Sequence, residues 1–300
     1  MELWIGITIA AAFFQNVRSA LQKHLKGRLT TYGATYVRFI YAVPFVCIYL
    51  ALLAGPGNTP IPQLHATFFV STVFGATSQI IATFMLVHLF SYKNFAVGTT
   101  YSKTEIIQTA LFGLLILGDK LHLLAACGIV VSLIGVMLMS AGQGPTTLRT
   151  LLTAWTQRTA LIGIVSGSFF GLSLIGYRAA SLSLDNSTFW MQAGITLLCA
   201  TLFQSLAMGL WMCIKQSGEV TRVLRNWRTG TIVGLSGMLA SVCWLTAATL
   251  QNAAYVRVVG QVELFFTFAA SIIFFRERPG MLEVGGILLV ATGIILLLLG

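Results

Sequence analysis

Charge is scarce in this sequence. Asp, Glu, Lys and Arg make up 9% of the 300 residues, whereas about 25% is usual in a soluble globular domain. Hydrophobic residues make up 57%, and the mean hydropathy is +0.87. The apolar runs are long enough to cross a bilayer, which takes roughly 20 helical residues each. The composition excludes an ordinary soluble domain and predicts an all-α integral membrane protein with many spans.

Several chemical motifs are also lacking. The five cysteines lie within apolar runs without a CxxC pair, and the four histidines are far apart in the sequence. We therefore expect neither a disulfide framework nor a metal site. No P-loop, catalytic dyad or basic signal-peptide region is visible, so we expect no cofactor, no direct use of ATP and no enzymatic activity.

The basic residues lie mainly between the apolar runs. There are 18 Lys and Arg against 8 Asp and Glu, a net charge of +10. In the loops of a membrane protein such residues set the topology, because basic loops stay in the cytoplasm. Most fall in alternate loops, and the opposite side holds only Lys120 and Arg178. We predict a multi-pass protein of the bacterial cytoplasmic (inner) membrane with both termini outside, surrounded by the lipid bilayer and without a nucleic-acid partner.

Turn residues and charged clusters divide the sequence into ten predicted spans. These are Leu3–Val17, Ala34–Ala54, Ala66–Phe90, Asn94–Leu117, Leu121–Ala141, Thr159–Tyr177, Ser187–Cys213, Gly230–Leu250, Ala253–Phe275 and Met281–Leu299. The first is short, and it reaches the usual length only if the helix continues to Leu21. Arg18 would then extend toward the membrane interface, as long basic side chains do.

One long stretch of the sequence occurs twice. Residues 94–139 align with residues 252–297 at a constant offset of 158, which pairs Glu105 with Glu263. Because each half holds an odd number of spans, the second half enters the membrane from the opposite side. We therefore predict ten transmembrane helices as two inverted five-helix repeats, residues 1–141 and 159–300, joined by a loop at 142–158. Inverted repeats place substrate and ion sites near the midplane, between the halves.

Glycines seven residues apart mark the fifth and tenth spans. Gly128 and Gly135 in one, and Gly286 and Gly293 in the other, predict close helix packing. In two five-span halves, this pattern resembles the EamA-like members of the drug/metabolite transporter superfamily. The spacing also resembles the last helix of small multidrug resistance proteins. Those proteins carry their essential carboxylate in the first helix, where this chain has Gln15 and Asn16.

Glu105 and Glu263 each lie near the middle of a predicted span. A charged residue there costs roughly 2.5–3.5 kcal/mol on insertion scales, and it usually faces a cavity or a partner. The two glutamates either bind Arg or Lys as structural partners or handle substrate and protons, and we favour the second role. Polar stripes on other spans are expected to converge on the same cavity. The predicted substrate and proton pathway comprises Glu105, Glu263, Tyr101, Gln108, Gln15, Gln79, Gln192 and Trp244.

Three basic residues lie inside predicted spans. Lys103 does not share a helix face with Glu105, so we expect it to meet another helix or to extend to the interface. Arg38 and Arg257 could bind phosphate or carboxylate, but each lies about one turn from a span end. Extension of the side chain to the interface is the simpler expectation for both.

The sequence predicts a secondary transporter that exports a small polar or amphipathic metabolite with coupling to protons. A flippase for a lipid-linked headgroup and a non-transporting membrane protein are the alternatives. Glu263 is expected to carry the coupling proton, because Val259, Gly260 and Phe266 on its helix face offer no side-chain donor, whereas Tyr101 can donate to Glu105. The substrate remains open, as does the choice between monomer and homo-oligomer.

Overall fold

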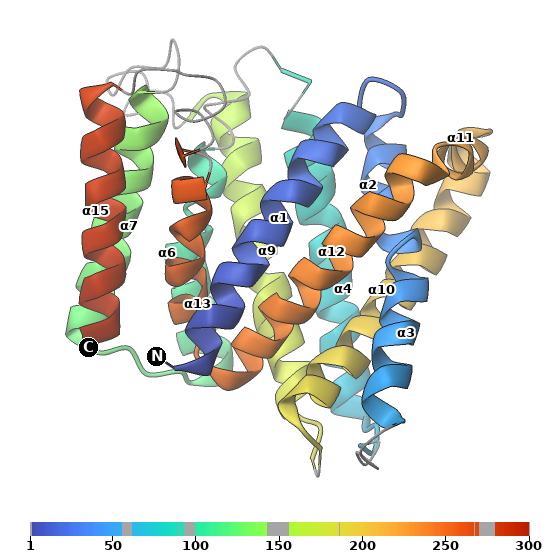
Figure 1. Cartoon of the computed structure of the whole chain (residues 1–300), viewed down its shortest axis with the longest axis horizontal. Coiled ribbons are helices and arrows are strands. Elements are labelled where there is room, and N and C mark those ends of the chain that lie inside the picture. Colours follow the sequence, from blue (N-terminus) through green and yellow to red (C-terminus); the bar gives the residue numbers. More distant parts are fainter. Residues whose placement is uncertain are drawn as a thin grey trace.

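The computed structural model describes residues 2–55, 62–89, 91–92, 100–142, 156–185, 187–266, 268–269 and 280–299. All regular elements within these ranges are helical (Figure 1). The first half contains α1 (Leu3–Leu25), α2 (Thr31–Ile40), α3 (Val43–Ala54), α4 (Ala66–Leu89), α6 (Glu105–Phe112), the π-helix η1 (Gly113–Leu117) and α7 (Leu123–Gly142). The second half contains α9 (Arg158–Leu182), α10 (Phe189–Lys215), α11 (Glu219–Arg225), α12 (Trp227–Leu250), α13 (Ala253–Val259), the 3₁₀-helix η3 (Gly260–Val262) and α15 (Met281–Leu299).

Short polar residues and one proline determine several helix boundaries. The side chains of Thr30, Thr188 and Asn252 accept hydrogen bonds from backbone N–H groups at the starts of α2, α10 and α13, as N-capping residues do. Pro44 lies in the first turn of α3, where its missing N–H donor is tolerated. It divides the predicted continuous span Ala34–Ala54 into α2 and α3.

Seven helical segments within the described residues are long and apolar enough to cross a membrane. They are α4, α7, α9, α10, α12, α15 and the α2–α3 pair. The first segment, α1, has 23 residues and extends beyond Leu21, as its predicted continuation required. The two segments that carry Glu105 and Glu263 are divided into shorter helices. The all-helical fold is thus observed, and the count of ten spans remains a prediction.

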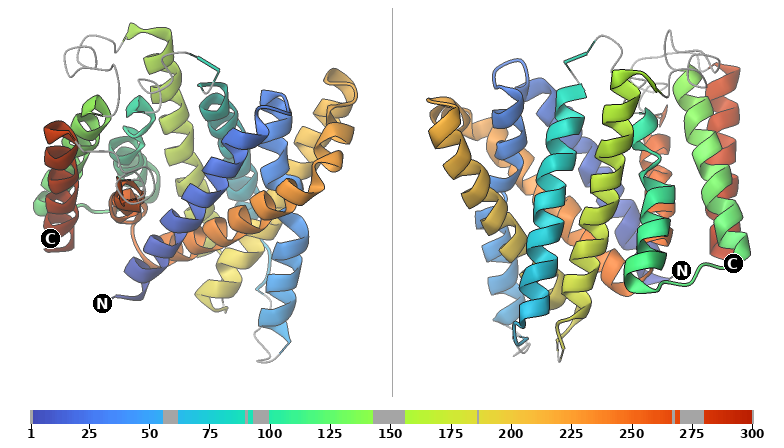
Figure 2. Two further views of the ribbon diagram at one scale, coloured as in Figure 1. Left: turned by 45° about the horizontal axis from the view of Figure 1, so that its top comes forward. Right: turned by 180° about the vertical axis from the view of Figure 1, so that it is seen from behind.

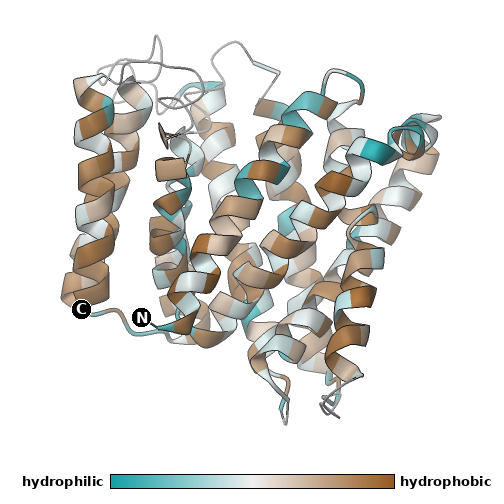
Figure 3. Ribbon diagram, viewed as in Figure 1, coloured by the Kyte–Doolittle hydropathy of each residue, from teal (hydrophilic) through white to brown (hydrophobic). Residues whose placement is uncertain are grey.

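Many large apolar side chains lie on the outside of the protein, and many polar side chains lie inside it. Large apolar residues such as Leu115, Ile214 and Val70 face outward and are at least 70% exposed. Thr, Ser, Gln, Arg and Glu side chains are buried between the helices. The ribbon in Figure 3 is accordingly brown over most of its length, with teal segments at the helix ends and near the centre. This distribution is what a lipid environment requires.

The two halves contact each other through helix pairs that are equivalent in the repeat. Helix α1 packs against α12, and the repeat counterparts α9 and α4 pack against each other (Figure 2). A Cβ added to Gly128 would lie 2.6 Å from Gly293 O, and one added to Gly135 would lie 2.6 Å from Gly286 O. This register makes α7 and α15 antiparallel, in agreement with inverted repeats. Small residues permit such close helix contact in membranes.

Both glutamate-bearing segments are irregular immediately before the glutamate. In the first half, Lys103 N and Thr104 N donate to carbonyls three residues earlier, at 3.0 and 3.1 Å. In the second half, η3 ends one residue before Glu263. The two irregular turns coincide at the repeat offset of 158 residues. The predicted spans Asn94–Leu117 and Ala253–Phe275 each contain an irregular turn at this point, and residues 94–99, 267 and 270–275 of these spans lie outside the described part of the chain. Interrupted helices are typical of binding sites in transporters.

Candidate functional site

A cavity of about 400 Å³ lies between the two repeats. Its size falls in the range of small-molecule sites. The polar lining consists of Gln15, Asn16, Arg18, Ser19, Arg38, Gln79, Ser102, Lys103, Glu105, Ser173, Tyr177, Ser241, Trp244, Arg257 and Glu263. Leu86, Phe170, Leu174, Leu245 and Leu264 complete it. The predicted pathway residues Glu105, Glu263, Gln15, Gln79 and Trp244 thus all reach one cavity.

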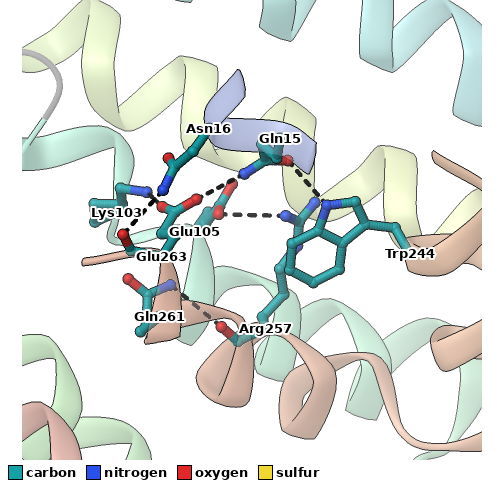
Figure 4. Close-up of polar contacts among 8 residues, drawn as sticks. All are labelled: Gln15, Asn16, Lys103, Glu105, Trp244, Arg257, Gln261 and Glu263. Atoms are coloured by element: carbon teal, nitrogen blue, oxygen red, sulfur yellow. Dashed lines mark hydrogen bonds and ion pairs between the residues drawn. The ribbon is translucent and has the colours of Figure 1, made fainter. Parts of the chain in front are cut away.

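Two ion pairs cross between the repeats (Figure 4). Lys103 of the first repeat contacts the Glu263 carboxylate of the second. Arg257 of the second repeat reaches Glu105 of the first, with 3.5 Å between Nη1 and Oε1. Each of the two carboxylates is therefore paired with a cation from the opposite half. Among the described residues, no three His, Cys, Asp or Glu side chains converge as metal ligands would.

Helix α1 and Trp244 surround the Glu263 pair. Gln15 Nε2 donates to Glu263 Oε2 at 2.9 Å, and Gln15 Oε1 accepts from Trp244 Nε1 at 3.0 Å. Asn16 Nδ2 donates to the backbone oxygen of Glu263 at 3.0 Å. The guanidinium carbon of Arg257 lies 4.9 Å from the centroid of the Trp244 ring, within the distance of a cation–π contact. Trp244 therefore connects the surroundings of both ion pairs.

These contacts remove the reason for assigning the coupling proton to Glu263. The prediction depended on a helix face without donors, and that face is indeed apolar. However, Gln15 of α1 and Lys103, in the turn before α6, both donate to the Glu263 carboxylate. The donors to the Glu263 carboxylate come from the other repeat. The spacing of residues along its own helix could not reveal them.

The three arginines of the cavity do not extend to the interface. Arg18 is 5% exposed and Arg38 is 6% exposed, and both line the cavity together with Arg257. Arg38 Nη1 donates to Thr83 Oγ1 at 3.1 Å. The predicted extension of these side chains is therefore wrong. Lys103 contacts Glu263 of the second repeat, which agrees with one of its two predictions, contact with another helix.

A second polar network joins α4, α9 and α10 beside the cavity. Tyr177 Oη donates to Gln79 Oε1 at 3.0 Å. Gln204 Nε2 donates to the same oxygen at 2.9 Å and to Ala76 O at 3.1 Å. Sequence reasoning missed Gln204 and Tyr177. The only available signal for Gln204 was an amide in the middle of a long apolar run.

Three of the predicted pathway residues contact other parts of the protein. Gln108 Nε2 donates to Ile164 O of α9 at 3.4 Å. Gln192 donates to the backbone oxygen of Leu184. Tyr101 is buried in a small cluster with Ala141, Ala160 and Ile164. None of the three belongs to the described lining of the cavity, and their part in a pathway remains a prediction.

The helical fold, the paired repeats and the charged central cavity define a polytopic membrane protein of the transporter type. The model of the EamA-like transporter family matches residues 2–141 and again residues 157–299. The chain belongs to this family, so the resemblance seen in the sequence is confirmed, and the protein is a membrane transporter of the drug/metabolite type.

Structural comparison supports the same fold. One solved crystal structure, titled only as that of a protein, matches with a TM-score of 0.68 and 11% sequence identity. The match covers 98% of this chain and 94% of that chain. At this identity the likeness shows the fold alone. No curated protein matches the sequence.

Proposed function

We propose that this protein is a secondary transporter that binds a small polar or amphipathic metabolite in the central cavity and exports it with coupling to protons. The observation that carries the proposal is the pair of crossed ion pairs within one cavity. Each carboxylate lies at an interruption of its helix, and each is paired with a cation from the other repeat.

Transporters built from inverted repeats alternate their access by movement of one repeat against the other. Such a movement changes the distance between Lys103 and Glu263, because the two residues belong to different repeats. Breaking a buried ion pair leaves uncompensated charge, which is strongly unfavourable. A proton on the carboxylate, or a substrate group beside the cation, would compensate that charge. Ligand binding would thereby shift the balance between the two arrangements of the repeats.

Export and the bacterial inner membrane belong to this proposal as well. The distribution of basic loops supports the orientation, and the family resemblance supports export of a metabolite. Protons and the lipid bilayer are the other proposed partners.

The experiment is transport into proteoliposomes with and without an imposed pH gradient. Candidate metabolites are first screened by thermal stabilisation of the purified protein. Glu105→Gln and Glu263→Gln each remove one ionisable group at nearly constant volume, and Glu283→Gln outside the cavity is the control. The variant of the proton-carrying residue should lose uptake driven by the gradient while retaining substrate binding.

Two results would contradict the proposal at different points. If wild-type uptake is the same with and without the gradient, proton coupling is wrong. If the wild-type protein moves none of the stabilising metabolites, the transport function itself is wrong. Comparison of the two variants also decides which glutamate carries the proton.

A further inference from the structure

The cavity contains more cationic than anionic side chains. Arg18, Arg38, Lys103 and Arg257 line it, against Glu105 and Glu263. Both carboxylates are engaged by Lys103 and Arg257. Among the residues that the structure describes, neither Arg18 nor Arg38 forms an ion pair with a carboxylate. Two guanidinium groups of the cavity are therefore not in ion-pair contact with a carboxylate in this part of the chain, and Arg18 has only a longer-range charge interaction with Glu263.

The two remaining arginines lie beside each other. Each flanks Gly237 of α12, where an added Cβ would lie 3.4 Å from Arg18 Cδ and 3.7 Å from Arg38 Cγ. The missing side chain at Gly237 thus leaves room for both basic stems. Both residues are at least nine-tenths buried, and Arg18 Nε has no hydrogen-bond partner among the described atoms.

Buried guanidinium groups without an anion are unfavourable, because the surroundings replace little of their hydration. An anion between the two arginines would compensate their charge and their mutual repulsion. The planar guanidinium group matches carboxylate and phosphate oxygens with paired hydrogen bonds. Apolar residues such as Phe170, Leu174 and Leu245 line the same cavity, so the bound molecule can also carry an apolar part.

We propose that Arg18 and Arg38 form an anion-binding subsite of the cavity, which takes the carboxylate or phosphate group of a small organic anion. This inference rests on the proposed transport function, for which it names the substrate class. The two ion pairs engage Lys103 and Arg257, so Arg18 and Arg38 are the groups available to the substrate.

The test compares matched anionic and neutral probes. Benzoate with benzamide, succinate with succinamide, and phenyl phosphate with phenol are titrated against the purified full chain, together with inorganic phosphate. We expect that either the carboxylate probes or the phosphate probes raise the Tm of the protein. Their neutral counterparts should leave the Tm unchanged. The carboxylate and phosphate arms show which anionic group the subsite prefers.

Substitutions then locate the binding. Arg18→Gln and Arg38→Gln should each raise the Kd of the best anion about 10- to 100-fold, as expected for loss of hydrogen bonds between charged groups. Arg38→Lys, which keeps the charge and loses the planar fork, should have an intermediate effect and serves if Arg38→Gln does not fold. Arg228→Gln is the control, because Arg228 is exposed at the start of α12 beside Trp227.

The subsite is refuted if the neutral probes stabilise as well as the anions, if no anion stabilises, or if both glutamine variants keep wild-type affinity. Vesicle uptake separates this outcome from failure of the transport proposal. Uptake of neutral or cationic compounds without anion binding would retain the transporter and remove the subsite. Anion binding without uptake of any bound compound would retain the subsite and remove the transporter.

Discussion

The ion pair between Lys103 and Glu263 joins the two repeats within the cavity, and its removal should reveal how strongly they are coupled. We consider Lys103→Gln, Glu263→Gln and the variant that combines them. Each single substitution leaves one charge inside the cavity without its partner. The double substitution leaves two neutral amides that can still form a hydrogen bond.

The burial of the two side chains determines how much stability each substitution should cost. Breaking a buried ion pair typically costs about 3–5 kcal/mol. The Glu263 side chain is 9% exposed and that of Lys103 is 24% exposed, so water in the cavity partly hydrates a lone charge. We therefore expect the lower end, about 3 kcal/mol for each single variant, which corresponds to a fall in Tm of about 6–12 °C at the usual 2–4 °C per kcal/mol. The double variant should lose about as much as either single variant, which leaves an interaction energy of about 3 kcal/mol.

The assay is thermal unfolding of the purified proteins in detergent, evaluated as a double-mutant cycle. A control cycle combines Lys103→Gln with Glu219→Gln. Glu219 lies in α11 and accepts a hydrogen bond from Thr30 N at 2.7 Å, outside the described lining of the cavity. Distant sites should be additive within about 0.5 kcal/mol. If the losses of stability for Lys103→Gln and Glu263→Gln also add within about 0.5 kcal/mol in the double variant, the reasoning is refuted.

Two further predictions concern topology and packing. In a background without the five native cysteines, a single cysteine at Asn58 should react with an impermeant reagent in intact cells and one at Asn226 should not. The reverse pattern would contradict the orientation, and a mixture would indicate dual insertion. Gly135→Leu should lower Tm by several degrees, because its Cβ would lie 2.6 Å from Gly286 O and overpacking costs about 1–3 kcal/mol. Gly285→Leu, with no neighbouring atom within 4 Å of the added Cβ, should have little effect, and an equal loss in both would contradict close packing of α7 and α15.

The sequence was sufficient for features that repeat at a fixed spacing. The offset of 158 residues pairs Glu105 with Glu263, and both line one cavity. The glycine spacing predicted close helix packing, which the structure shows between α7 and α15. Features that depend on contacts between helices were not predictable. Arg18 and Arg38 lie near predicted span ends, where extension to the interface is the usual behaviour. Their burial follows from the continuation of α1 to Leu25 and from the space at Gly237, which no local pattern shows.

The repeat also explains why some lining positions of the cavity are equivalent while their side chains differ. Five pairs of lining residues are equivalent at the offset of 158: Gln15 and Ser173, Asn16 and Leu174, Ser19 and Tyr177, Leu86 and Trp244, and Glu105 and Glu263. The duplicated backbone therefore brings equivalent positions to the same space, as two inverted repeats require. Only the glutamates are identical within these pairs.

The remaining charges break this symmetry. The positions equivalent to Arg18 and Arg38 hold Gly176 and Thr196, so the proposed anion subsite belongs to the first repeat alone. Duplicated backbone positions suit a movement that exposes the cavity alternately to the two sides. Unequal side chains permit a substrate to be bound in one defined orientation throughout that movement. In this proposal the substrate class is decided by the residues in which the repeats differ, and the mechanism by those in which they agree.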